Sequence, residues 1–180
     1  MDDSRRAALT LVTPRLSLRP ATEADIDALH RLWTDPEVRR FLWDGEIITR
    51  ETAAEVIGDL IACFDSLGFG LWVAATFEAP RQTIGFAYLR PFGEPVELEI
   101  GYGLDPAQWH RGYATEIARA LLRFGFEALG REHLYARTDL PNAASVQVME
   151  RAGMRFAGRS DEGAFGGTVT YVLRRAELPA

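Results

Sequence analysis

The chain has 180 residues, of which 47% are hydrophobic and 26% are charged, and its formal net charge is -6 with a pI of about 5.1. This balance is typical of one ordinary globular domain and excludes a disordered or fibrous protein. The acidic charge argues against a nucleic-acid-binding protein, which normally carries a basic face, and the single cysteine, Cys63, excludes an intrachain disulfide.

The N-terminal third predicts one strand followed by three helical segments. Residues 1–12 are expected to be frayed, and alternating apolar residues favour a strand over 15–20. Residues that commonly cap helices mark the three helix starts. These starts lie at Thr22, at Asp35 before Pro36, and at Thr49 or Thr52.

The middle of the chain predicts three strands, over 69–77, 83–92 and 96–104, which are separated by turns containing Pro or Gly. The connections are short, which favours an antiparallel meander. Apolar residues then recur at helical spacing over 112–129. This spacing predicts a helix that packs on the sheet.

The C-terminal part predicts a strand over 134–138, a helix from Asn142 to Gly153, and strand-like segments over 154–158 and 168–173. The sequence contains no internal repeat and no stretch typical of a linker between domains. We therefore expect a single α/β domain over 1–180.

Residues 109–116, WHRGYATE, form a glycine-containing turn at the start of the long helix. A helix start exposes backbone N–H groups without partners in the helix and carries partial positive charge, so it binds phosphate readily. Gly112 lets a ligand approach the backbone, and His110 and Arg111 add side chains that reach a diphosphate. The turn is neither a Walker loop nor a dinucleotide fingerprint, and a purely structural helix entry is the alternative.

The order of these elements and three motifs resemble the GCN5-related N-acetyltransferases (GNAT), in the branch of ribosomal-protein N-terminal acetyltransferases (RimJ/RimL-like). The motifs are Glu99-Ile100-Gly101-Tyr102, Trp109 to Glu116, and Asn142 to Met154, and the resemblance covers Thr13 to Tyr171. It implies an α/β (α+β) fold with a mixed, mostly antiparallel central sheet flanked by helices. It also implies an enzyme that uses acetyl-CoA as its cosubstrate.

The resemblance further implies that the turn clasps the pyrophosphate of coenzyme A. The implied cofactor-binding residues are His110, Arg111, Gly112, Tyr113, Ala114, Thr115 and Asn142. Asn142 would contact the pantetheine arm, although helix capping alone explains this residue. The turn departs from the family at Trp109, where Gln or Arg is commoner, and at His110, which replaces a frequent glycine.

Acetyl transfer needs an uncharged amine and a proton source for the departing thiolate. Glu99 is the expected base, directly or through water, with Glu97 behind it. The alternative is a solvated carboxylate at a sheet edge, paired with a nearby arginine. Many relatives carry a tyrosine acid where this chain has Met149. Ser145 therefore becomes the expected proton donor near the cofactor sulfur, with water or Tyr102 behind it, and a plain helix residue is the alternative.

The expected activity is N-acetyl transfer from acetyl-CoA to a primary amine, a protein N-terminus or a small molecule, by direct attack in a ternary complex. A non-catalytic acyl-CoA-binding module or sensor is the alternative. The three histidines lack metal-ligand spacing, so we expect no metal site. No signal peptide or membrane span is evident, so we expect a cytoplasmic protein without nucleic-acid or membrane partners, and dimers are common among relatives.

The segment that lines the acceptor pocket in this family corresponds to Trp33 and to residues 41–44 of this chain. It contains Phe41, Trp43 and Asp44. Aromatic residues in such helices usually belong to the core, whereas Trp43 and Asp44 fall in a predicted loop. We expect these two residues to be available to an amine.

Overall fold

The computed structural model describes residues 3–94, 96–163 and 165–178. Within these ranges one eight-stranded sheet has the order β1-β2-β3-β4-β5-β6-β8-β7. The strands are β1 (Leu11–Val12), β2 (Leu16–Pro20), β3 (Leu71–Thr76), β4 (Gly85–Phe92), β5 (Glu97–Leu104), β6 (His133–Asp139), β7 (Arg155–Ser160) and β8 (Thr168–Arg174). The helices are α1 (Asp3–Ala8), α2 (Ile26–Trp33), α3 (Pro36–Leu42), α4 (Arg50–Ser66), α5 (Tyr113–Glu127) and α6 (Ala143–Arg151).

The helix starts follow the capping residues of the sequence. Asp35 accepts a hydrogen bond from the backbone N–H of Glu37 at the start of α3, and Thr49 rather than Thr52 caps α4. The start predicted at Thr22 is a 3₁₀ turn, Glu23–Asp25, that leads into α2. Each predicted helix is therefore present, and its start is set by local chemistry.

The predicted meander is confirmed, because β3, β4 and β5 pair antiparallel in sequence order. The first of these strands begins at Leu71 rather than at residue 69, and Gly70 before it lies close to the backbone carbonyl of Leu60 in α4. The N-terminal segment differs from the frayed start that we expected: Asp3–Ala8 is helical, and Leu11–Val12 pairs antiparallel with β2. A contact in the core supports this order, because the indole N–H of Trp72 donates to the carbonyl of Leu9.

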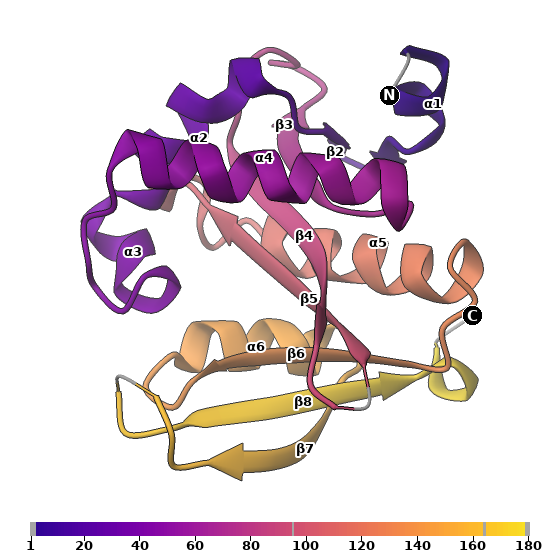
Figure 1. Cartoon of the computed structure of the whole chain (residues 1–180). Coiled ribbons are helices and arrows are strands. Elements are labelled where there is room, and N and C mark those ends of the chain that lie inside the picture. The colour runs from indigo at the N-terminus through magenta and orange to yellow at the C-terminus, as the bar shows by residue number, and fades with distance from the viewer. Residues whose placement is uncertain (1–2, 95, 164, 179–180) are drawn as a thin grey trace.

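Two groups of helices cover the two faces of the sheet, and Figure 1 shows α4 in front of the strands and α5 behind them. Ile117, Leu121 and Leu122 of α5 are fully buried in the larger core cluster. Helices α2 and α4 enclose the smaller cluster on the other face, with Leu29 and Ile57 fully buried. This burial is the main favourable term that holds each helix group on its face.

The sheet opens between β5 and β6. All other neighbouring strands pair antiparallel, whereas β5 and β6 run parallel and share one register pair, Glu99 with Tyr135. Beyond that pair the two strands diverge, and Figure 1 shows them crossing at an angle. The part of β5 from Gly101 onward therefore borders an opening in the sheet, with α5 and α6 on one side and α2 and α4 on the other.

None of the helices in the described ranges is both long enough and apolar enough to span a membrane.

Candidate functional site

The turn before α5 has the geometry of an anion clasp. Gly112 is the N-cap of α5 and has a left-handed backbone conformation with φ of 79°. None of the described side chains caps this helix start, so the N–H groups of its first turn are available to a ligand. A Cβ at Gly112 would meet Arg15 alone, with Nη2 at 3.5 Å, which leaves room for a group above the glycine.

His110 and Arg111 are both exposed beside this helix start. His110 has a positive φ of 60°, which is uncommon for a residue other than glycine and marks a shaped turn. The turn is fixed on its other side by Trp109, whose indole N–H donates to the carbonyl of Leu104 at 3.0 Å. Ala114 and Thr115 are half-buried in the first turn of the helix.

Arg15, which no pattern in the sequence marked as a site residue, lies beside the turn. Its Nη1 donates to the carbonyl of Arg111 at 2.9 Å, and its guanidinium stacks 4.6 Å from the ring centre of Tyr113. Arg15 also forms an ion pair with Glu116 in the first turn of α5, with Nη2 and Oε2 2.8 Å apart. Arg15 and Glu116 are 101 residues apart in the chain, so no local pattern signals this contact.

Glu116 holds the start of α5 against the β1–β2 turn. Burial by itself would raise the pKa of its carboxyl group, but hydrogen bonds from Thr13 and Arg15 outweigh burial and lower the pKa. Glu116 is therefore a charged anchor for the turn. An open cavity of about 740 Å³ lies alongside it, and its lining includes Gly112, Thr115 and Arg119.

Asn142 caps α6, as local chemistry alone predicts. Its side-chain oxygen accepts from the backbone N–H of Ser145 at 3.2 Å, and its Nδ2 donates to Thr138 Oγ1 at 2.9 Å. The cap places Ser145 in the first turn of α6. Both the oxygen and the nitrogen of the Asn142 amide therefore have hydrogen-bond partners within the protein.

Ser145 lies next to Tyr102, since Ser145 Oγ and the phenol oxygen of Tyr102 are 3.3 Å apart. Burial raises the pKa of Tyr102, and the hydrogen bond with Ser145 opposes that rise only in part. Tyr102 therefore stays protonated at neutral pH. Met149, which replaces the tyrosine of many relatives, is 1% exposed and belongs to the core.

Glu99 is buried among arginines rather than open to solvent. Its side chain is 4% exposed, and Arg90 Nη2 lies 3.1 Å from Oε1. Both Nε and Nη2 of Arg137 lie 2.7 Å from Oε2. The arginine-paired alternative is therefore present in the structure, although the carboxylate is buried and not solvated. Glu97 lies on the same face of β5 and is half-buried.

Glu99 and Ser145 lie on opposite sides of the sheet. Side chains alternate along β5, and Tyr102, which contacts Ser145, packs against the core on the α5 and α6 side. Glu99 shares the other face with Gly101, over which the ring of Tyr88 packs closely. Tyr88 belongs to the cluster enclosed by α2 and α4. The two predicted catalytic residues thus lie on opposite faces of the sheet, near the place where β5 and β6 part.

Tyr88 on β4, which was not predicted from the sequence, packs over Gly101 of β5. A Cβ on Gly101 would overlap its ring and phenol oxygen, so the missing side chain of Gly101 makes room for the phenol. Burial is the main reason that the pKa of Tyr88 is raised. Tyr88 therefore presents a neutral O–H at the point where β5 leaves β6.

The segment expected to line the acceptor pocket lies on this same side. Phe41 of α3 contacts Phe165 of the β7–β8 loop, with ring centres 5.6 Å apart, and Trp43 packs 5.6 Å from Trp33. Trp43 is half-buried rather than open, whereas Asp44 is exposed and has a positive φ of 53°. An aromatic contact thus joins α3 to the loop beyond β7.

Asp139, at the end of β6, is 9% exposed. Burial raises the pKa of this carboxyl group, and the charge of Asp44 raises it further. A raised pKa in the folded state means that ionisation of Asp139 opposes folding. The stability associated with its protonated form is present below the usual pKa of aspartate, near 3.9, and is lost as the pH rises through the folded value.

We therefore predict that Asp139→Asn raises the melting temperature at pH 7 and that this gain disappears near pH 3. Thermal unfolding of both proteins at the two pH values measures the effect. A variant that melts below wild type at pH 7 would show instead that the interactions of the carboxylate stabilise the fold by more than its burial costs.

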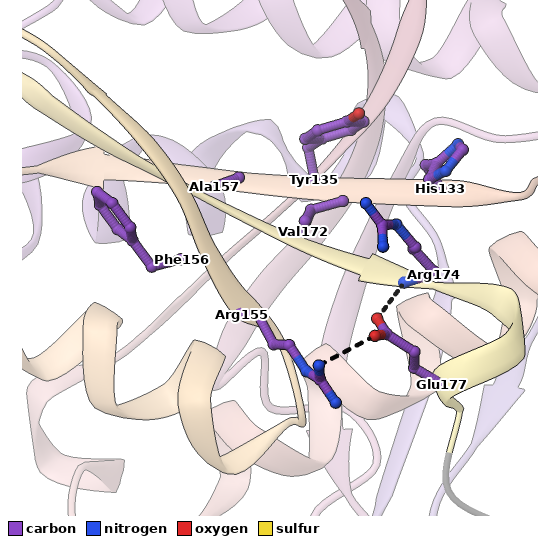
Figure 2. A pocket seen from close by; sticks show the side chains of 8 residues that line it. All are labelled: His133, Tyr135, Arg155, Phe156, Ala157, Val172, Arg174 and Glu177. Carbon is purple, nitrogen blue, oxygen red and sulfur yellow. Dashed lines mark hydrogen bonds and ion pairs between the residues drawn. The ribbon is translucent and has the colours of Figure 1, made fainter.

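A second cavity, of about 560 Å³, lies on the outer strands and is shown in Figure 2. Its lining includes His133 and Tyr135 of β6, Phe156 of β7 and Arg174 of β8. An ion pair of 3.3 Å between Arg155 and Glu177 closes one end. Neither this cavity nor the larger one is lined by Glu99 or Ser145, so neither marks the predicted reaction centre.

Comparison with known proteins identifies the family. Residues 15–155 match the family described as acetyltransferase (GNAT) domain. The chain is 31% identical to an FsC-acetyl coenzyme A-N(2)-transacetylase of Aspergillus fumigatus, over 96% of this chain and 79% of that protein. It is also 28% identical to a solved acetyltransferase of Agrobacterium tumefaciens, with a TM-score of 0.78 over 92% of this chain and 94% of that one.

A more distant solved structure shares the fold alone. It is a RimL ribosomal L7/L12 alpha-N-protein acetyltransferase in complex with coenzyme A, 17% identical, with a TM-score of 0.77 over 92% of this chain and 97% of that chain. These likenesses confirm the predicted mixed, mostly antiparallel fold and the predicted enzyme class. Acetyl-CoA, the cosubstrate of this family, is confirmed with them. The chain belongs to the acetyltransferase (GNAT) family.

Proposed function

We propose that the protein transfers the acetyl group of acetyl-CoA to a primary amine by direct attack in a ternary complex. The observation that carries this proposal is the opening between β5 and β6, which has Glu99 and Tyr88 on one side and Ser145 with Tyr102 on the other. A thioester placed in the opening would meet the amine from one face. Its sulfur would leave toward the other face.

The start of α5 fits the diphosphate of coenzyme A. Its first-turn N–H groups lack a capping side chain among the described residues, and the space above Gly112 is open except for Arg15. We assign His110, Arg111, Gly112, Tyr113, Ala114 and Thr115 to this contact, because phosphate binds such N–H groups and the positive end of the helix dipole. Asn142, at the start of α6, is assigned to the pantetheine arm.

On the acceptor side, the amine must lose a proton before or as it attacks the thioester carbon. Free alkylamines have a pKa near that of lysine, about 10.4, so they are mostly protonated at neutral pH. Oε2 of Glu99 accepts two bonds from Arg137, whereas Oε1 accepts one from Arg90 and retains an acceptor position. We assign Glu99 the role of proton acceptor, through a water at Oε1.

On the cofactor side, the C–S bond breaks as the C–N bond forms, and the thiolate takes a proton. Ser145 is assigned as the donor, and the phenol of Tyr102 supplies a proton to Ser145 across the 3.3 Å contact. One proton of the ammonium group goes to Glu99. The second N–H proton, lost as the tetrahedral intermediate collapses, returns through water to Tyr102 and replaces the proton that Tyr102 and Ser145 pass to the thiolate. Glu99 and Ser145 therefore exchange protons with the substrates on opposite faces of β5.

We predict that Ser145→Ala lowers kcat by about tenfold to a hundredfold, at or below the lower limit of the range for general acid catalysis, because water replaces the hydroxyl. The KM for acetyl-CoA should change little, since Asn142 and the turn before α5 remain. Steady-state thiol release measures both constants. Ser145→Thr, which keeps a hydroxyl group, should retain more activity than Ser145→Ala, and equal losses in the two variants would remove Ser145 from the proton route.

The acceptor is either a protein N-terminus or a small-molecule amine. The family resemblance in the turn before α5 favours the RimJ/RimL-like branch, and the fungal relative is named for the transfer of an acetyl group to a nitrogen. A cytoplasmic location and a homodimer belong to the same proposal.

The function is tested by calorimetric titration with acetyl-CoA, followed by thiol-release assays with peptides and small amines. Binding together with amine-dependent release of coenzyme A is the expected result. Binding without turnover on any amine would favour the non-catalytic acyl-CoA-binding module, and no binding by the folded protein would overturn the proposal.

A further inference from the structure

Glu99 joins two arginines on the acceptor side of the sheet. Arg90 lies directly opposite Glu99 on β4, and Arg137 reaches it from β6. The side chains of Arg90 and Arg137 are 49% and 38% exposed, whereas that of Glu99 is 4% exposed. The carboxylate is thus buried beneath two guanidinium groups that remain partly open to solvent.

Aromatic rings fix both guanidinium groups. Arg90 lies over the ring of Tyr88, with its Cζ 5.3 Å from the ring centre, and Arg137 lies over Phe92 at 4.8 Å. Phe92 in turn packs edge-on against Tyr135, with ring centres 5.3 Å apart, and Figure 2 shows Tyr135 on β6. A ring on one side and a shared carboxylate on another hold each arginine in place, which lowers the entropy lost when a ligand binds.

These two arginines have unused binding capacity. A guanidinium group carries five N–H donors, and Glu99 occupies one nitrogen of Arg90 and two nitrogens of Arg137. One carboxylate also balances only one of the two positive charges. Glu99 therefore leaves one of these two charges without a paired carboxylate, with the half-buried Glu97 further along the same face of β5.

We propose that Arg90 and Arg137 bind a carboxylate group of the acceptor, so that the acceptor is a small amino acid with a free carboxylate. This inference rests on the proposed function and names the substrate class of the same site. Guanidinium groups are well matched to carboxylates, because their planar N–H donors pair with both oxygens. Glu99 then has a second role, as the residue that positions the two arginines.

The spacing along the strands limits the length of the acceptor. Tyr88 lies opposite Gly101 at the opening, and Arg90 lies opposite Glu99, two residues further along β4. Two residues of strand span about 7 Å. An amine that reacts at the opening while its carboxylate reaches Arg90 therefore has only a few bonds between the two groups. Short amino acids meet this limit, whereas an N-terminal residue of a protein has its α-carboxyl group in a peptide bond.

The test compares amino acids with their amides, glycine with glycinamide and β-alanine with β-alaninamide. Each kcat/KM is expressed per concentration of uncharged amine, because amidation also lowers the pKa of the amine. Cadaverine serves as a dicationic amine. With wild type and saturating acetyl-CoA, kcat/KM for the free acids should exceed that for the amides by at least about tenfold, as expected for a charge-assisted contact. Arg90→Gln and Arg137→Gln should lower this ratio toward one. The matched control is Arg81→Gln, which changes an exposed arginine in the β3–β4 turn and should keep the wild-type ratio.

Removal of an arginine leaves Glu99 with fewer partners, so folding of each variant is checked by thermal unfolding. Arg137→Lys is a further control, because it keeps the positive charge without the paired N–H donors.

A binding measurement separates this inference from the proposed function. In the presence of coenzyme A, N-acetylglycine should bind wild type more tightly than N-acetylglycinamide, and Arg137→Gln should abolish the difference. Equal use and equal binding of acids and amides would overturn the carboxylate site, as would a preference for cadaverine. Binding of the acids without turnover would support the carboxylate site and count against the transferase mechanism.

Discussion

Replacing Gly112 with valine is expected to weaken acetyl-CoA binding by at least about a hundredfold. Gly112 has φ of 79°, a conformation that costs other residues about 1–2 kcal/mol and is worst for a β-branched side chain. A side chain there also fills the space above the first-turn N–H groups of α5, and each hydrogen bond to a charged group contributes about 1.5–3 kcal/mol. Loss of two such bonds corresponds to the expected change, at 1.4 kcal/mol per factor of ten.

A matched variant separates ligand binding from backbone strain. Gly130 has φ of 65°, and a Cβ there would contact nothing within 4 Å, so Gly130→Val imposes a similar conformational cost after the C-terminal end of α5. Both variants should lose similar thermal stability, while only Gly112→Val should lose affinity for acetyl-CoA in calorimetry. Similar affinities in the two variants would show that the start of α5 is a structural entry and that the cofactor lies elsewhere.

Much of the fold could be predicted because its signals are local. Asp35, Thr49 and Asn142 cap their helices through backbone N–H groups two or three residues away, so the sequence alone locates those helix starts. The meander follows from short connections between alternating strands. The helical spacing after Gly112 likewise predicted α5, which buries its apolar stripe as expected.

The environment of Glu99 could not be predicted in the same way. Its partners, Arg90 and Arg137, come from β4 and β6, and the second partner depends on which strand adjoins β5. The sequence favoured the β3–β5 meander and the resemblance implied a mixed sheet, but neither gave the single register pair between β5 and β6 that brings Arg137 to Glu99. The contact between Arg15 and Glu116 escaped prediction for the same reason, since it joins the β1–β2 turn to a helix far along the chain.

The alternation of side chains along β5 places the two proposed proton-transfer groups on opposite faces of the sheet. Glu99 and Tyr102 are an odd number of residues apart on β5, so one faces α2 and α4 and the other faces α5 and α6. A base and an acid on the same face would compete for one proton. On opposite faces of the opening, each can serve a different atom of the reaction, the amine nitrogen on one side and the sulfur on the other. The missing tyrosine at Met149 therefore leaves the proposed route intact, because Tyr102 approaches Ser145 from the strand.

Replacing Glu99 with glutamine is expected to lower kcat/KM at pH 7 by about 10²–10⁴, the range of general base catalysis. The amide keeps the size of the side chain but cannot carry the negative charge that pairs with Arg90 and Arg137. Removing one partner of a fully buried ion pair costs about 3–5 kcal/mol, and the cost here should be smaller because both arginines are partly exposed. Thermal unfolding measures this loss, and Glu55→Gln, at an exposed position on α4, controls for the change of surface charge.

The pH dependence of the Glu99→Gln deficit distinguishes its two proposed roles. If Glu99 takes the amine proton, the variant depends on the fraction of amine that is already uncharged. That fraction rises tenfold per pH unit until the pH approaches the amine pKa, near 10. The deficit should then be largest near pH 7 and should shrink steadily toward pH 9.5, measured as kcat/KM with one amine. A deficit that stays constant over this range would remove the base role and leave Glu99 as the residue that positions the arginines. Activity lost only in Glu97→Gln would transfer the role to that neighbouring carboxylate.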